Sequence, residues 1–188
     1  MSPRASSRDA ILDAAEALVL DAGAARLTLD AVAGRAGVSK GGLLYNFPTK
    51  DALLKSLIAR LCERFDAAKD AARLHAKAGP AAGLKAFVAT SVKADGSDGT
   101  VAGALLAAIA SDPRLLLPVR EHHQRYVAEL TASGLSFPRA AAVWLATEGL
   151  WLLELMKLSP LTPSQRKQVV TELLRLADEA EQPAGQRQ

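Results

Sequence analysis

The stretch AGVSKGGLLYNFPTK, residues 36–50, places two adjacent glycines where the apolar residues on either side are spaced as in a helix. A glycine inside a helix costs about 1 kcal/mol relative to alanine, and alanine is used freely elsewhere in this chain. Gly41 and Gly42 therefore leave bare backbone in a short helix that alanine would have made more stable. The question is what approaches the helix at this point.

The residues before and after this stretch predict short helices with their own caps. Thr28 can cap a helix over LDAVAGRA that ends at Gly37, and Ser39 can cap the helix KGGLLYN. Thr49 can cap a long fourth helix with one apolar stripe. An amphipathic helix that stops at Gly23 comes before all of these. The sequence therefore predicts three short helices followed by a long one.

The second and third of these helices have the pattern of a helix-turn-helix, in which a tight turn containing glycine joins two short helices. Ala33 is small enough for the helices to approach, Gly37 can adopt the positive φ of the turn, and Leu43 can anchor the second helix in the core. The second helix of such a unit enters the major groove of DNA, with its N-terminal residues at the bases. Here those residues are Ser39, Lys40, Gly41 and Gly42.

This pattern offers a reason for the two glycines. Without side chains, the leading turn can approach phosphates and base edges closely, and its free N–H groups carry partial positive charge. Lys40 adds an ammonium group, and Tyr45 and Lys50 can reach flanking phosphates. The alternative is a helical hairpin that merely tolerates its glycines.

The span from Arg8 to Leu54 resembles the N-terminal DNA-binding domain of the tetracycline-repressor (TetR) family of bacterial transcription regulators. The matching words, in order and without gaps, are ILDAAEALVLDAG, LTLDAVAGRAGVSKG and LYNFPTKDALL. The resemblance implies an all-α homodimer, in which a three-helix DNA-binding domain precedes a larger helical bundle that binds ligand. It also implies a repressor that a small-molecule effector releases from a palindromic operator.

The resemblance assigns roles to individual residues of the first 50. Thr28 would contact phosphate, Ser39, Lys40, Gly41 and Gly42 would face the groove, and Tyr45 and Lys50 would hold the DNA backbone. The chain departs from the commonest family pattern at Leu44, where a tyrosine is frequent, and at Asn46, where a histidine is frequent. Base readout would then fall to Lys40, Asn46 and the shape of the DNA.

Composition limits the class of protein. Only 4% of the residues are aromatic and the chain is rich in alanine and leucine, which favours helices. No apolar run approaches the roughly 18 residues of a membrane span, and the start lacks the apolar core of a signal peptide. A single cysteine, Cys62, excludes an intrachain disulfide and a multi-cysteine zinc site. We therefore expect a soluble cytoplasmic protein.

Positive charge gathers around the predicted recognition helix. The net charge of the whole chain is +3. Residues 26–50 alone also carry +3, because Arg26, Arg35, Lys40 and Lys50 face a single acid, Asp30. This window favours a nucleic-acid partner, although an ordinary solvated surface would have the same composition.

The pattern breaks at Ala78-Gly79-Pro80, which predicts a division of the chain. A DNA-binding domain would occupy residues 1–50, a connecting helix residues 50–75, and an effector-binding and dimerisation domain residues 76–182. Residues 183–188 would form a disordered tail. Turn signals after residue 80 predict about five more helices, about nine in total.

A helix predicted over residues 139–158 is apolar on two faces, so it must be buried on both. The first face carries Ala140, Trp144, Thr147, Glu148, Trp151 and Leu155, and the second carries Ala142, Leu145, Gly149, Leu152 and Met156. A central core helix would suffice in a monomer. The family resemblance implies instead that the last two helices form a homodimer interface.

Glu148 lies one helical step from both Trp144 and Trp151 and marks a candidate effector pocket. Such a carboxylate suits a cationic or amine-bearing ligand, with tryptophan adding a cation–π contact. The alternative is a structural acid paired with Arg120 or Arg125. Phe87 and Ser91, on an earlier helix, could line the opposite wall or simply belong to the core.

The remaining candidates for chemistry are weak. His122 and His123 point about 100° apart on a helix, so they cannot easily chelate one ion, and we expect both on a solvated surface. Cys62 borders an apolar stripe and is expected to be buried and inert. No nucleophile–base pair, phosphate loop or metal spacing is present, so we predict no enzyme, cofactor or metal. The competing function is a helical-bundle ligand carrier or enzyme without sequence-specific DNA binding.

Overall fold

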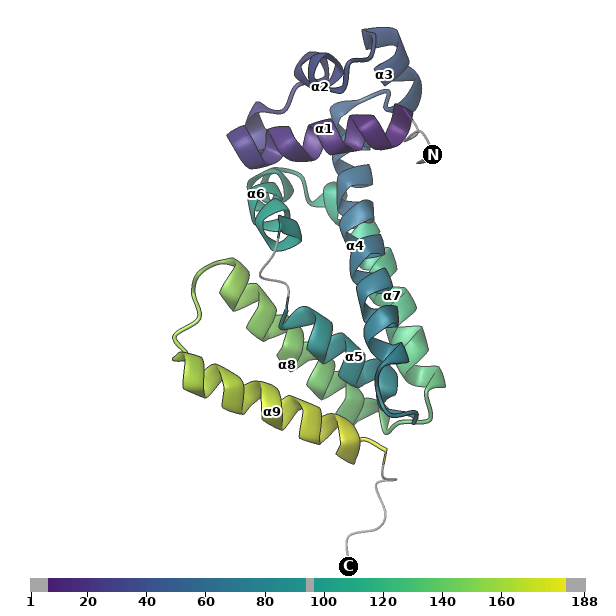
Figure 1. Cartoon of the computed structure of the whole chain (residues 1–188), viewed down its shortest axis with the longest axis vertical. Helices are drawn as coiled ribbons and strands as arrows, with labels where there is room; N and C mark the ends of the chain where they lie inside the picture. Colours follow the sequence, from purple (N-terminus) through teal and green to yellow (C-terminus); the bar gives the residue numbers. More distant parts are fainter. Residues whose placement is uncertain (1–6, 94–96, 182–188) are drawn as a thin grey trace, which may run out of the picture. The chain divides into compact units, whose positions relative to one another are not determined.

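The structure, a computed structural model, describes residues 7–93 and 97–181 of the 188-residue chain. The described residues form nine α-helices and two short 3-10 helices without any strand, which confirms the predicted all-α fold (Figure 1). The predicted disordered tail, residues 183–188, lies outside these ranges. In chain order the elements are α1 (Ser7–Ala22), η1 (Ala24–Arg26), α2 (Leu29–Ala36), α3 (Lys40–Asn46), α4 (Lys50–Leu74), α5 (Ala82–Ser91), α6 (Ser97–Ser111), η2 (Pro113–Leu116), α7 (Leu117–Ala132), α8 (Phe137–Leu155) and α9 (Pro163–Glu179).

The described residues divide into two compact units that do not follow chain order. The first unit contains residues 7–62 and 97–120, and the second contains residues 63–93 and 121–181. Helix α6 belongs to the first unit, where it packs against α1 and η1. Helices α4 and α7 each contribute one end to the first unit and the other end to the second.

The short helices of the first unit start where their sequence caps predict. The hydroxyl oxygens of Thr28, Ser39 and Thr49 each accept a hydrogen bond from the backbone N–H three residues on, over 3.2, 3.1 and 3.1 Å. Each cap satisfies a donor that a helix N-terminus leaves free. The predicted starts of α2, α3 and α4 are confirmed.

The turn between α2 and α3 depends on Gly37. Its φ of 66° lies in the left-handed region that side chains disfavour. This conformation lets the N–H of Val38 donate to the carbonyl of Ala33 over 3.1 Å, which closes the end of α2. The predicted helix-turn-helix is therefore present.

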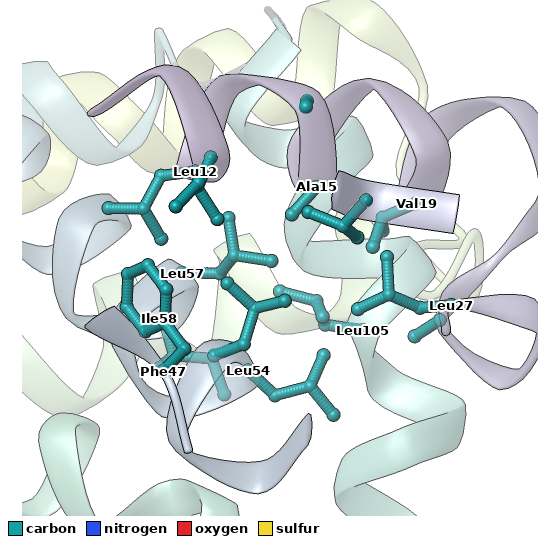
Figure 2. Packing of buried hydrophobic residues seen from close by; sticks show 14 of the residues in the cluster. Leu12, Ala15, Val19, Leu27, Phe47, Leu54, Leu57, Ile58 and Leu105 are labelled. Carbon is teal, nitrogen blue, oxygen red and sulfur yellow. The ribbon is translucent and has the colours of Figure 1, made fainter. Parts of the chain in front are cut away.

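The core of the first unit joins the predicted recognition helix, through Leu43, to α1, α4 and α6, and Figure 2 labels members from these last three helices. Leu43 of α3 is fully buried and Ala33 of α2 is nearly so, as the helix-turn-helix pattern predicts. This packing fixes α3 from one side. The labelled members of the cluster are Leu12, Ala15, Val19, Leu27, Phe47, Leu54, Leu57, Ile58 and Leu105.

The second unit has a separate core made by α5, α7, α8 and α9. The first helix that lies wholly in this unit, α5, has no side-chain cap of its own. The carboxylate of Glu181 accepts a hydrogen bond from the N–H of Ala81 over 2.8 Å at this end. Gly79 leaves room for that carboxylate, since a Cβ at Gly79 would lie 3.1 Å from Glu181 Oε1.

Helix α8 buries one side within the second unit and leaves an apolar side exposed. Leu145, Leu152 and Met156, from the second of the predicted apolar faces, are all exposed, Leu145 by 59%. Val169 of the adjacent helix α9 is exposed as well. We call these four residues the α8–α9 apolar face. None of the described helices is long and apolar enough to cross a membrane.

Candidate DNA interface and effector site

The outer side of α3 is open, as a recognition helix requires. Lys40, Gly41 and Gly42 are exposed in its leading turn, while Leu43 faces the core. Tyr45 is 90% exposed one turn further on, which is unusual for an aromatic side chain. Helix α3 therefore presents small residues, one lysine and one tyrosine on a surface that no described part of its own unit covers.

The two glycines differ in their surroundings. A Cβ at Gly41 would meet no atom within 4 Å, so the fold itself does not require glycine there. A Cβ at Gly42 would lie 3.3 Å from Ser39 Oγ, the hydroxyl that caps the helix. A side chain at Gly42 would crowd the capping hydroxyl, so glycine at this position preserves the cap. No contact in the described chain requires glycine at position 41.

The other polar side chains predicted to meet DNA already have partners in the chain. Lys40 Nζ lies 2.8 Å from Asp30 Oδ1 in a pair exposed on both sides, which contributes little to stability. Asn46 Nδ2 donates to the carbonyl of Gly42 over 2.9 Å, which leaves its amide oxygen to accept. Lys50 Nζ donates to the carbonyl of Ala25 over 3.4 Å.

The predicted effector residues fall partly into one cluster of rings in the second unit. Phe87 stacks on Tyr126 with ring centroids 4.5 Å apart, and Phe65 meets the edge of Phe87 at 5.2 Å. Trp144 lies 5.8 Å from Tyr126 and 5.6 Å from His123. We call these residues, together with His122, whose ring meets Phe65 edge-on, the ring cluster.

Glu148 faces this cluster, and its partner is not Arg125. Its carboxylate lies 3.7 Å from His123 Nε2, and the predicted alternative of a pair with Arg125 is wrong because Arg125 lies 3.7 Å from Asp66 instead. Burial raises the pKa of the Glu148 carboxyl, and the neighbouring His123 opposes that shift. The site therefore holds a partly buried acid beside an imidazole.

The expectation that both histidines are solvated is wrong for His122, which is only 7% exposed. Its ring packs edge-on against Phe65, 5.9 Å away, because this side of α7 turns toward α4. Burial lowers the pKa of His122, while the charge of Asp66, 3.3 Å away, works in the opposite direction. His123 is partly exposed, as expected of a residue about 100° further round the helix.

Two of the predicted pocket residues stand apart from the cluster. Ser91 is buried on α5 and Trp151 is partly exposed on α8, and neither shares a ring contact with the described cluster residues. Tyr126 and His123 are the functional candidates that sequence reasoning missed. The i, i+4, i+8 spacing of His122, Tyr126 and Leu130, all buried on α7, is the signal that could have found Tyr126.

The remaining candidates are Cys62 and the side chains that could bind a metal ion. Cys62 is partly buried on α4. Within residues 7–93 and 97–181, no group of three His, Cys, Asp or Glu side chains could hold a metal ion.

Known proteins resemble both parts of the chain. Residues 11–57 match the family model described as "Bacterial regulatory proteins, tetR family", and residues 81–178 match the one described as "Tetracyclin repressor-like, C-terminal domain". No curated protein matches the sequence significantly.

Solved structures share the fold over nearly the whole chain. A TetR-family regulator from Rhodococcus sp. is 21% identical, with 94% of this chain and 98% of that chain covered and a TM-score of 0.70. A transcriptional regulator from Streptomyces coelicolor A3(2) is 24% identical, with 91% and 98% covered and a TM-score of 0.72. The flavonoid-responsive regulator FrrA is 26% identical, with 95% and 98% covered and a TM-score of 0.67.

The family models account for the capped helix-turn-helix and for most of the second unit, and members of the family are generally regulators rather than enzymes. The chain therefore belongs to the tetR family of bacterial regulatory proteins, DNA-binding transcription regulators with a ligand-binding C-terminal domain.

Proposed function

We propose that the protein is a homodimeric repressor that binds a palindromic operator and leaves it when a small-molecule effector binds. The observation that carries this proposal is Gly41, an exposed glycine in the leading turn of α3 with no neighbour in its own chain. The fold would be more stable with alanine at this position. A glycine retained there is explained by a second surface that approaches the backbone, and the major groove is such a surface.

The DNA contacts follow from the exposed side of α3 and its flanks. Ser39, Lys40, Gly41 and Gly42 enter the groove, and Thr28, Tyr45 and Lys50 contact phosphates on either side. Asn46 reads a base through its amide oxygen, because its nitrogen is bonded to the carbonyl of Gly42. An asparagine held in this way can accept a hydrogen bond from a base but is less free to donate one.

A second copy of the chain covers the α8–α9 apolar face. Leucine and methionine side chains exposed together on α8 and at its C-terminal end are typical of a protein interface rather than of a monomer surface. A twofold dimer would present two α3 helices to successive major grooves, about one DNA turn apart. A palindromic operator follows from that symmetry.

The effector binds in the second unit, among Phe87, Ser91, Trp144, Glu148 and Trp151. FrrA, of similar fold throughout, responds to a flavonoid, which supports a small-molecule site in a body of this kind. The effector must bind the non-operator form of the dimer more tightly, since only differential affinity can shift the balance between two states. Binding would then favour a spacing of the two α3 helices that no longer fits DNA.

Selection of bound duplexes from a random DNA pool tests this function, with affinity then measured at two salt concentrations. We expect enrichment of one palindrome, and an affinity whose logarithm falls linearly with the logarithm of salt as phosphate contacts release counterions. No enrichment, with binding absent even at low salt, would refute the regulator and leave the ligand carrier as the better account.

A further inference from the structure

A single acid lies among the cations around α3, and it is paired with the lysine of that helix. Asp30 is the only acidic residue between Arg26 and Lys50. Its Oδ1 lies 2.8 Å from Lys40 Nζ, and both side chains are more than half exposed. Because an exposed ion pair contributes little to folding, stability does not account for a carboxylate at this position.

The pair joins the leading turns of two helices. Asp30 lies in the first turn of α2, and Lys40 is the first residue of α3. The positive end of a helix dipole favours an anion in the first turn and disfavours a cation there. The position of Lys40 is therefore better explained by a role in binding than by the stability of α3, and Asp30 offsets its charge in the free protein.

The ammonium group of Lys40 can keep this ion pair while it contacts a base. A lysine has three N–H donors, and the pair with Asp30 engages one of them. The other two match O6 and N7 of guanine, the acceptors that lysine contacts in the major groove. A phosphate contact is less favourable for this lysine, because it would bring the Asp30 carboxylate close to the negatively charged DNA backbone.

We propose that Asp30 is a specificity-determining residue of the DNA interface. It positions Lys40 towards the base edges and withholds it from phosphates, so that non-specific DNA binds more weakly while the correct sequence keeps its base contact. Asp30 acts through Lys40 and contacts no base itself. The proposal deepens the proposed function and rests on it, because it requires Lys40 to enter the groove of an operator.

Fluorescence anisotropy with two duplexes tests the role of Asp30. One duplex carries the selected operator, and the other carries a scrambled sequence of the same length and base composition. Asp30→Asn frees Lys40 to bind a phosphate, which should steepen the slope of log K against log salt by about 0.9 and strengthen binding to scrambled DNA about 5–10-fold at 0.1 M salt. Operator affinity should change less, because Lys40 is already engaged there. We expect the ratio of the two affinities to fall at least about 3-fold, and an unchanged ratio would overturn the proposal.

Asp21→Asn is the matched control. Asp21 of α1 pairs with Arg35 of α2 over 2.8 Å, and both side chains are exposed, so this ion pair resembles the first but does not involve α3. The substitution changes the net charge by the same amount. It should shift the affinities for both duplexes together and leave their ratio unchanged. An equal fall in the ratio for the control would overturn the proposal, because charge alone would then explain the effect.

A double-mutant cycle shows whether Asp30 acts through Lys40. In a Lys40→Ala background, Asp30→Asn should leave the ratio unchanged, because no ammonium group remains to be positioned. A further fall in this background would mean that the carboxylate contacts a base directly, and it would overturn the proposal. Thermal unfolding should differ little among these variants, because the pair is exposed. A large loss of thermal stability in Asp30→Asn would show a structural role and would also overturn the proposal.

The two proposals fail in different ways. If random selection yields a palindrome and Asp30→Asn keeps the affinity ratio, the repressor stands and the role of Asp30 is rejected. If the natural protein binds all duplexes alike, the operator is rejected, and any role of Asp30 in specificity is rejected with it.

Discussion

The two units differ in how fully they satisfy their own side chains. Every buried polar side-chain atom without a hydrogen-bond partner in the described residues lies in the second unit. In the first unit, Arg60 is bonded to both Asp13 and Glu16, and each short helix carries its cap. The second unit also leaves the α8–α9 apolar face exposed.

The first unit pairs its buried polar side chains, whereas the second leaves three buried polar atoms without a geometric hydrogen bond and an apolar face exposed. The first unit meets DNA with a surface already formed, so its fold needs nothing from the partner. The second unit leaves apolar side chains exposed, and under the proposed function a second copy and an effector complete it. Substitutions in the first unit should therefore change stability, while those in the second should change assembly and ligand response.

The largest expected effect is on the dimer. Leu145→Asp combined with Leu152→Asp alters both leucines in each of two copies, and their lost burial weakens association by about 6 kcal/mol at roughly 1.5 kcal/mol per side chain. Sedimentation velocity should show a folded monomer. Leu74→Asp, which alters an equally apolar but isolated residue that is exposed at the end of α4, should leave a dimer. A dimer that survives the double substitution would break the comparison.

The next effect is on the stability of the first unit. Leu43 is fully buried on α3, while Leu44 beside it is exposed, so the pair provides its own control. Leu43→Ala should lower the free energy of unfolding by about 2–5 kcal/mol, and Leu44→Ala by less than about 1 kcal/mol. Urea denaturation followed by circular dichroism measures both. Similar losses in the two variants would show that α3 is not packed as described.

A smaller and more specific effect is expected at Gly41. Gly41→Ala should raise stability by up to about 1 kcal/mol, because nothing in the chain meets the new methyl group. Operator affinity should fall by about 1–3 kcal/mol, the usual range for a methyl forced into a packed contact. Gly34→Ala, on the exposed side of α2, should match the first change without the second. Fluorescence anisotropy with the selected operator measures the affinity of each variant and shows whether Gly41 is needed for DNA binding.

The smallest effect concerns Glu148, and only its direction is predicted. Burial raises the pKa of this carboxyl in the folded state above the ordinary value of 4.5, so the folded protein binds the proton more tightly than the unfolded chain. Stability is then lost as pH rises through and above that value. Glu148→Gln should be more stable than the natural protein at pH 7, and the difference should vanish below about pH 4.5. A constant difference across urea titrations at several pH values would place the carboxyl in water.

Sequence reasoning predicts the structural features that depend on residues close together in the chain. The caps at Thr28, Ser39 and Thr49 act over three residues, and the turn at Gly37 needs one glycine. Both features can therefore be recognised in the sequence. The two apolar faces of α8 are likewise readable from its own period, but the exposure of one of them in the described chain is not. Local chemistry of this kind defines the DNA-binding side.

The contacts that sequence reasoning misses join distant helices. The pairing of His123 with Glu148 and the burial of His122 depend on how α7 packs against α8 and α4, which no local pattern encodes. Helix α6 similarly follows α5 in the chain but packs in the first unit. The proposed effector site depends on such contacts, which is why the sequence does not predict its arrangement.

The carboxylate that closes the start of α5 also sets the order in which the second unit can form during synthesis. Glu181 and the N–H of Ala81 are 100 residues apart in the chain. At about 5–20 residues per second, a ribosome reaches Glu181 roughly 5–20 s after Ala81. Throughout that interval the first turn of α5 lacks its acceptor, whereas the caps of α2 and α3 are available within three residues. The second unit therefore completes the hydrogen bond at the start of α5 only after Glu181 has been synthesised.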